Sequence, residues 1–158
     1  DEFTFVEYAT GDWRCIGYVL ASGEAIVGAG GGASWTKVTK TEADFTVGST
    51  QSITLFTLAA GEILKGIVLK HTTAFTGGTA TAYTMEVGIS GDTDKYLTSS
   101  DVFITPTDTI IYGGQNFIIE NWGSGTTVQL TATSVGDTLA NITAGAVEVY
   151  YLVETVKS

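Results

Sequence analysis

From about residue 49 onward, apolar and polar residues alternate in short runs. The clearest run is residues 79–89, in which five positions would share one face of a strand: Thr81, Tyr83, Met85, Val87 and Ile89. Successive side chains of a strand point to opposite faces, so strict alternation predicts a half-buried β-strand. A helix needs an apolar stripe with a spacing of three and four residues, and no segment has that pattern with caps.

Further runs rich in Thr, Val, Ile and Tyr are separated by Gly, Asp, Asn and Ser, and each predicts a strand. These runs are 51–58, 63–73, 115–120, 126–135 and 144–155, with shorter ones at 102–104 and 110–112. The last long run is apolar on both faces, which predicts a central strand or one covered by a neighbouring subunit. Many short strands predict an all-β fold, an antiparallel β-sandwich or jelly roll over residues 49–158.

The first 48 residues have a different pattern, which is irregular and rich in aromatic residues. The flanks of Ala21–Glu24 predict a short hairpin. We expect residues 1–48 to form an N-terminal arm or a peripheral subdomain. Its candidate partner-binding residues are Phe3, Phe5, Tyr8 and Trp13.

Composition narrows the functional classes. Charged residues make up 15% of the chain, against about 25% in typical soluble domains, and a surface poor in charge suits an assembly. The net charge of −10 repels nucleic acids and anionic membranes. No apolar run approaches the length of a membrane span, and the start of the chain lacks the pattern of a signal peptide. We therefore expect a soluble protein that binds neither nucleic acid nor membrane.

Asp92 and Asp94 follow the strand 79–89 and raise two chemical possibilities. An EF-hand loop that began at Asp92 would need an oxygen ligand at Tyr96 and a glutamate at Phe103, so that motif fails. A looser calcium site with Asp101 stays possible, but aspartates after a strand more often form turns. A glycosidase pair needs two carboxylates on a rigid scaffold, and these two share one loop.

Other catalytic chemistry has little support. Cys15 and His71 are the only cysteine and the only histidine. Cys15 fits a small buried apolar residue, and His71 fits a strand-end residue that is solvated or hydrogen-bonded. The glycine-rich loop at 28–34 has no lysine for a phosphate cradle. We expect no enzyme, no cofactor and no metal.

Two aromatic residues on predicted loops, Tyr112 and Trp122, are further candidates for partner binding. Exposed aromatic rings stack on sugars or fill a partner's pocket. The simpler interpretation of Trp122 is that it folds back over an open edge of the core.

The stretch ILKGIVLKHTTAFTGGTATAYTMEVGISGDTDKYL (63–97), followed by the closing strand GAVEVYYLVE, resembles small β-sandwich proteins that decorate the capsids of tailed bacteriophages. The resemblance covers residues 49–156 and leaves the N-terminal zone uncovered. It implies a jelly-roll-like virion protein without catalytic residues, made in the host cytoplasm, that binds the outside of the shell and stabilises it. It also implies the major capsid protein or other virion proteins as partners, and a homo-oligomer, with a trimer favoured. The alternative function is a receptor- or glycan-binding domain of a tail fibre or tail tip.

Overall fold

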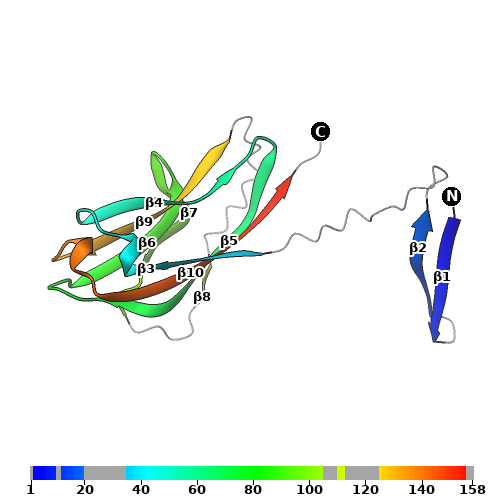
Figure 1. Ribbon diagram of the computed structural model, residues 1–158, viewed down its shortest axis with the longest axis horizontal. Helices are drawn as coiled ribbons and strands as arrows, with labels where there is room; N and C mark the ends of the chain where they lie inside the picture. Colours follow the sequence, from blue (N-terminus) through cyan, green and yellow to red (C-terminus); the bar gives the residue numbers. More distant parts are fainter. Residues whose placement is uncertain (1, 10–11, 20–34, 105–109, 113–124, 156–158) are drawn as a thin grey trace. The chain divides into compact units, whose positions relative to one another are not determined.

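The computed structural model describes residues 2–9, 12–19, 35–104, 110–112 and 125–155, with side-chain detail for 35–104 and 125–155 (Figure 1). The chain divides into two compact units, Asp1–Ala33 and Ser34–Ser158. The first unit contains β1 (Glu2–Ala9) and β2 (Asp12–Val19), which pair antiparallel.

The second unit is a sandwich of two four-stranded antiparallel sheets. In spatial order, the first sheet holds β3 (Thr36–Thr41), β10 (Ala144–Thr155), β5 (Glu62–Thr76) and β8 (Ile110–Tyr112). The second holds β4 (Thr50–Leu58), β9 (Thr126–Val135), β6 (Ala82–Ile89) and β7 (Asp92–Asp101). The only helical turns in the described residues are two short 3₁₀ turns, η1 (Glu42–Asp44) and η2 (Leu139–Asn141).

The order of pairing identifies the topology as a jelly roll. The first strand of the sandwich pairs with the last, β3 with β10, and the next pairs inward are β4 with β9, β5 with β8 and β6 with β7. This is the pattern of one long antiparallel hairpin rolled into two sheets. The sandwich and jelly-roll expectation is confirmed, and β10 is central, between β3 and β5.

The core lies between the two sheets and follows the alternation of the sequence. On β6, Tyr83, Met85 and Val87 are fully buried, as the pattern predicted. Aromatic rings join the layers: Phe56 of β4 stacks on Tyr151 of β10 with centroids 3.8 Å apart. The two rings bring apolar surface of both sheets into contact.

Asp137 fastens one end of the sandwich. Its carboxylate accepts hydrogen bonds from the backbone N–H of Thr79 (2.7 Å), the N–H of Thr138 (2.7 Å) and the side-chain amide of Asn141 (2.6 Å). These donors hold the ionised form, so the pKa of Asp137 falls to about 2. The loop after β5 is thereby tied to the loop between β9 and β10.

Several elements differ from the predictions. The strand expected at 102–104 is absent there, and β7 occupies 92–101 instead. The first unit, expected to be irregular, contains the strands β1 and β2. The first arm of the hairpin expected around Ala21–Glu24, residues 16–20, overlaps β2, which pairs with β1. The turn and the second arm of that hairpin lie outside the described residues, as does the strand expected at 115–120. The division after Ala33 differs from the expected boundary at residue 48, because β3 pairs with β10 and so belongs to the sandwich.

Candidate interaction surface

The outer surface of the β3–β10–β5–β8 sheet carries a connected group of polar side chains centred on Glu148. Along β10, Val147 and Val149 are fully buried against the core. Since strand side chains alternate, Glu148 and Tyr150 face away from the core. The register places Lys70 of β5 opposite Glu148, and Lys37 of β3 opposite Tyr150.

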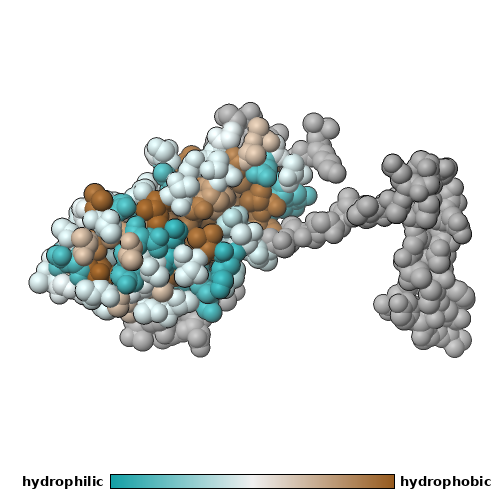
Figure 2. Space-filling view, in the orientation of Figure 1, coloured by the Kyte–Doolittle hydropathy of each residue, from teal (hydrophilic) through white to brown (hydrophobic). Residues whose placement is uncertain are grey.

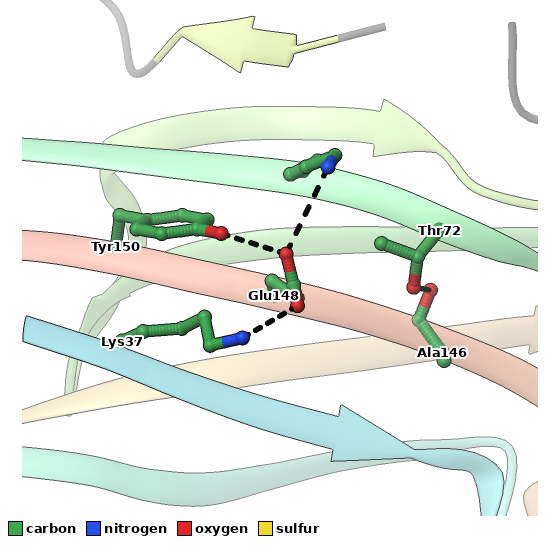
Figure 3. Close-up of polar contacts among 6 residues, drawn as sticks. Lys37, Thr72, Ala146, Glu148 and Tyr150 are labelled. Atoms are coloured by element: carbon green, nitrogen blue, oxygen red, sulfur yellow. Dashed lines mark hydrogen bonds and ion pairs between the residues drawn. The ribbon is translucent and has the colours of Figure 1, made fainter. Parts of the chain in front are cut away.

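Glu148 is the centre of this group (Figure 3). Its Oε1 accepts a hydrogen bond from Lys37 Nζ at 2.8 Å, and its Oε2 accepts one from the Tyr150 hydroxyl at 2.7 Å. Lys70 Nζ lies 4.0 Å from Oε2. One carboxylate therefore joins three strands, β3, β10 and β5.

The titration of these groups follows from the contacts. The hydrogen bond from Lys37, and then the one from Tyr150, lower the pKa of the Glu148 carboxyl. The same bonds raise the pKa of Lys37 and the pKa of the Tyr150 hydroxyl. Near neutral pH, Glu148 is therefore ionised, Lys37 is protonated and Tyr150 keeps its proton.

Apolar side chains lie beside this charged group. Val68 is directly opposite Tyr150, and Leu152 is opposite Gly66. Trp35 is 50% exposed, and its benzo ring lies over Gly66. A Cβ added to Gly66 would be only 2.7 Å from Cη2 of that ring, so the ring occupies the space that a side chain would need. At the same end of β5, Lys65 forms an ion pair with Glu154.

We call this surface the lysine face. Its members are Trp35, Lys37, Lys65, Val68, Lys70, Glu148, Tyr150, Leu152 and Glu154. Its lysines keep 40 to 50% of their side-chain surface exposed. Figure 2 shows the interleaving of apolar and polar residues over the visible side of the sandwich.

The aspartates that suggested metal or catalysis lie elsewhere, at the start of β7. Ile89 pairs with Asp92, so Ser90 and Gly91 form a two-residue turn, and Gly91 has a φ of 89° that favours glycine. Asp92 and Asp94 are exposed. Among the described residues, no three His, Cys, Asp or Glu side chains come together in an arrangement that could hold a metal ion.

Tyr96 and Leu97 of the same strand are buried, so the chain returns to the core after the turn. The structure thus gives Asp92 and Asp94 the position of residues beside a tight turn. Within the described residues there is also no helix long and apolar enough to cross a membrane.

The aromatic candidates fall on the less described parts of the chain. Phe3, Phe5 and Tyr8 belong to β1, and Trp13 to β2, where it pairs with Glu7. Tyr112 ends β8 in register with Val68. Trp122 lies outside the described residues. Partner binding by these six residues stays a prediction.

His71 was expected at a strand end, either solvated or hydrogen-bonded, and both the strand-end position and the solvated alternative are wrong. It lies in the middle of β5, opposite Val147, and is 3% exposed. Its Nε2 is buried with no hydrogen-bond partner in the described part of the chain. Burial lowers the pKa of His71, while a hydrogen bond with the backbone of Thr73 and the charge of Asp101 oppose the shift. Cys15 pairs with Phe5 in the hairpin of the first unit.

Sequence reasoning did not find the lysine face. The alternation along β10 placed Ala146, Tyr150 and Leu152 on one side of the strand, which was a usable signal. The meeting of Glu148 with Lys37 depends on the pairing of β3 with β10, and the two residues are 111 positions apart. Short-range patterns contain no information on such a register.

Comparison with protein-family models and with curated proteins finds no match. Two solved structures contain a chain with a similar fold. A chain of the cyanophage Pam1 capsid asymmetric unit is 22% identical, with a TM-score of 0.58 over 82% of this chain and 89% of its own length. A chain of the capsid of Ralstonia phage GP4 is 15% identical, with a TM-score of 0.53 over 81% of this chain and 87% of its own length. At these identities the likeness is one of fold.

Proposed function

We propose that the chain is a structural protein of a bacteriophage virion, a capsid decoration or minor capsid protein that binds the outside of the shell and stabilises it. The observation that carries the proposal is the fold shared with chains of two phage capsids over 81 to 82% of this chain. The low charge content and the jelly-roll topology support the same role, because both suit a protein that is one component of a larger assembly.

Attachment through the first unit is part of this proposal. A two-stranded hairpin such as β1–β2 is only marginally stable alone in water. Packing its aromatic residues on the major capsid protein or on a sister subunit would stabilise it, at about 25 cal/mol per Å² of apolar area buried before the costs of association. Phe3, Phe5, Tyr8 and Trp13 are the residues that we expect to make this contact.

A structural role also agrees with the position of His71. The only histidine of the chain is enclosed in the core, where a substrate would not reach it as a general base. The proposal therefore includes no catalytic activity and no cofactor. Partners are other virion proteins and further copies of the chain, with a trimer favoured.

The test is to locate the chain in purified particles of the phage that encodes it. Peptide mass spectrometry should detect it in washed particles, and cryo-electron microscopy should place it on the outside of the shell. Its absence from intact particles would refute the virion role.

The arm is tested by deleting residues 1–13, with an intact sandwich confirmed by its thermal melting. Occupancy on particles should fall sharply, because the sandwich alone lacks the aromatic contact. A matched control is Arg14→Lys, because Arg14 pairs with Val6 and not with any of the four proposed contact residues, and this variant should retain most of the occupancy. Full occupancy of the deletion variant would contradict attachment through the arm.

A second candidate function is receptor or glycan binding by a tail fibre or tail tip. The half-exposed ring of Trp35 favours it, because exposed aromatic rings stack on sugars. Trp35→Ala and Trp122→Ala should then each weaken adsorption to host cells without loss of particle stability. Normal adsorption by both variants would exclude this second function and leave the capsid role as the sole candidate.

A further inference from the structure

The described sandwich separates its charges between two surfaces. The lysine face has three of the sandwich's five described lysines and two carboxylates, Glu148 and Glu154. The β6–β7 hairpin has the opposite balance, with one lysine, Lys95, and four carboxylates. We call this second surface the acidic hairpin, and its carboxylates are Glu86, Asp92, Asp94 and Asp101.

We propose that the lysine face of one copy of this chain binds the acidic hairpin of a second copy, in a head-to-tail contact. The chain as a whole has a charge of −10, so a surface on which lysines outnumber carboxylates is an exception that an acidic partner would recognise. The chain itself supplies such a partner surface.

The lysine face has the composition of a protein interface. Its centre is apolar and aromatic, with Trp35, Val68, Tyr150 and Leu152 side by side on the sheet. Lysines surround this centre, and interfaces typically combine an aromatic centre with a polar rim. Glu148 holds Lys37 in a fixed position through a 2.8 Å hydrogen bond, so less side-chain entropy is lost on binding.

The acidic hairpin is accessible. Asp92, Asp94 and Asp101 are exposed, and β7 is one of the two edge strands of its sheet among the described residues. The tight turn at Ser90–Gly91 places Asp92 and Asp94 near the end of the sheet. Lysine ammonium groups and these carboxylates would form charge-assisted hydrogen bonds across the contact.

The two surfaces belong to different sheets, since the lysine face lies on β3, β10 and β5 and the acidic hairpin on β6 and β7. A contact between unlike surfaces is heterologous, so an open assembly keeps one free lysine face at one end and one free acidic hairpin at the other until a ring closes. A symmetric contact of either surface with itself would bring like charges together. The contact rests on the homo-oligomer of the proposed function and specifies its surfaces, but it forms between purified copies in solution, so its failure would leave attachment to the virion untouched.

The experiment uses the full chain and two double variants that remove charge with little change of shape. Lys37→Gln with Lys70→Gln changes the lysine face, and Asp92→Asn with Asp94→Asn changes the acidic hairpin. Sedimentation velocity over a concentration series should show self-association of the unmodified chain. Each double variant should weaken it roughly tenfold or more, since two charge pairs are lost, and salt should weaken the unmodified contact.

Mixing the two double variants is the decisive measurement. Each retains the surface that the other has lost, so a one-to-one mixture should form dimers that cannot extend or close. Glu42→Gln is the matched control, because it removes a carboxylate of η1 outside both surfaces and should not change association. Thermal melts must show that all variants are folded.

Three results would overturn the proposal. One is an unmodified chain that stays monomeric at all concentrations. Another is a double variant that associates as well as the unmodified chain, which would place the contact elsewhere, for instance on the first unit. The last is a folded mixture of the two double variants that forms no dimer.

Discussion

Gly145 occupies a position where no side chain fits, and Gly145→Ala should be among the most damaging single changes in the sandwich. The residue lies at an irregularity in the pairing of β10 with β5 and has a φ of 152°. An added Cβ would overlap Cδ1 and Cγ of the Phe75 ring and lie 2.7 Å from its Cε1. Phe75 is itself fully buried and stacks on Tyr83 with ring centroids 4.6 Å apart, so it has little freedom to move.

Two costs combine in this variant. Overpacking a filled core costs about 1–3 kcal/mol, and an alanine held at a φ that only glycine adopts readily costs about 1–3 kcal/mol. The sum is about 2–6 kcal/mol, a large part of the roughly 5–15 kcal/mol that stabilises a typical domain. We expect the Tm of the sandwich to fall by about 10 °C or more, measured by circular dichroism, with the urea midpoint falling at an unchanged m-value.

Gly91→Ala is the matched control, since Gly91 also has a positive φ, of 89°, but an added Cβ there would have no atom within 4 Å. Gly91→Ala should lose only the stability that corresponds to the unfavourable backbone conformation, without the cost of overpacking. Phe75→Leu, made in the unmodified chain and in Gly145→Ala, isolates the clash. The smaller side chain should recover part of the stability that Gly145→Ala loses. A Gly145→Ala variant no less stable than Gly91→Ala would refute the reasoning, as would full additivity with Phe75→Leu.

Three further predictions concern acid sensitivity and the core. Asp137 has a folded-state pKa of about 2, below its unfolded value, so its contribution to folding stability is fully present above about pH 4 and is lost as the pH falls through about 2. Asp137→Ala should therefore lower the Tm at neutral pH, and the difference in Tm from the unmodified chain should vanish in strong acid. The pKa of His71 is lowered by burial, so stability should fall as the pH drops below about 6.5, where the unfolded chain takes up a proton; His71→Gln should flatten urea midpoints between neutral pH and pH 5, and an unchanged slope would exclude His71 as the cause. Leu130→Ala removes a fully buried side chain and should cost about 2–5 kcal/mol in urea unfolding, whereas the exposed control Val135→Ala should change the free energy of unfolding by less than about 0.5 kcal/mol.

The strands that could be predicted from the sequence are those whose apolar pattern is uninterrupted. β9 was predicted at its observed bounds and β6 to within three residues, because burial of one face determines the alternation. β10 was also predicted at its observed bounds, from a run that is apolar on both faces, as suits a central strand. β7 was missed because Tyr96 and Leu97 are adjacent and both buried, next to irregular pairing with β6. Extra residues of that kind interrupt the period of two.

β3 was missed for another reason. Its sequence, TKVTKT, contains one apolar residue, Val38, because it is an edge strand with little surface to bury. Lysines on an edge strand also discourage backbone pairing with a strand of another chain along that edge. The lysine face escaped prediction for the same reason, since it needs both the existence of β3 and its register with β10.

The rolled-hairpin pairing has a consequence for the synthesis of the chain. β10 is the last strand of the sandwich to be synthesised, yet it is the strand with which both β3 and β5 pair, and the pairs reach back from Tyr151 to Thr36. Until β10 has left the ribosome, both of these strands expose backbone groups without their final partner. Contacts this distant in sequence make folding slow, and exposed strand edges favour aggregation. The nascent protein therefore stays prone to aggregation until β10 (Ala144–Thr155) has been synthesised and has paired with β3 and β5.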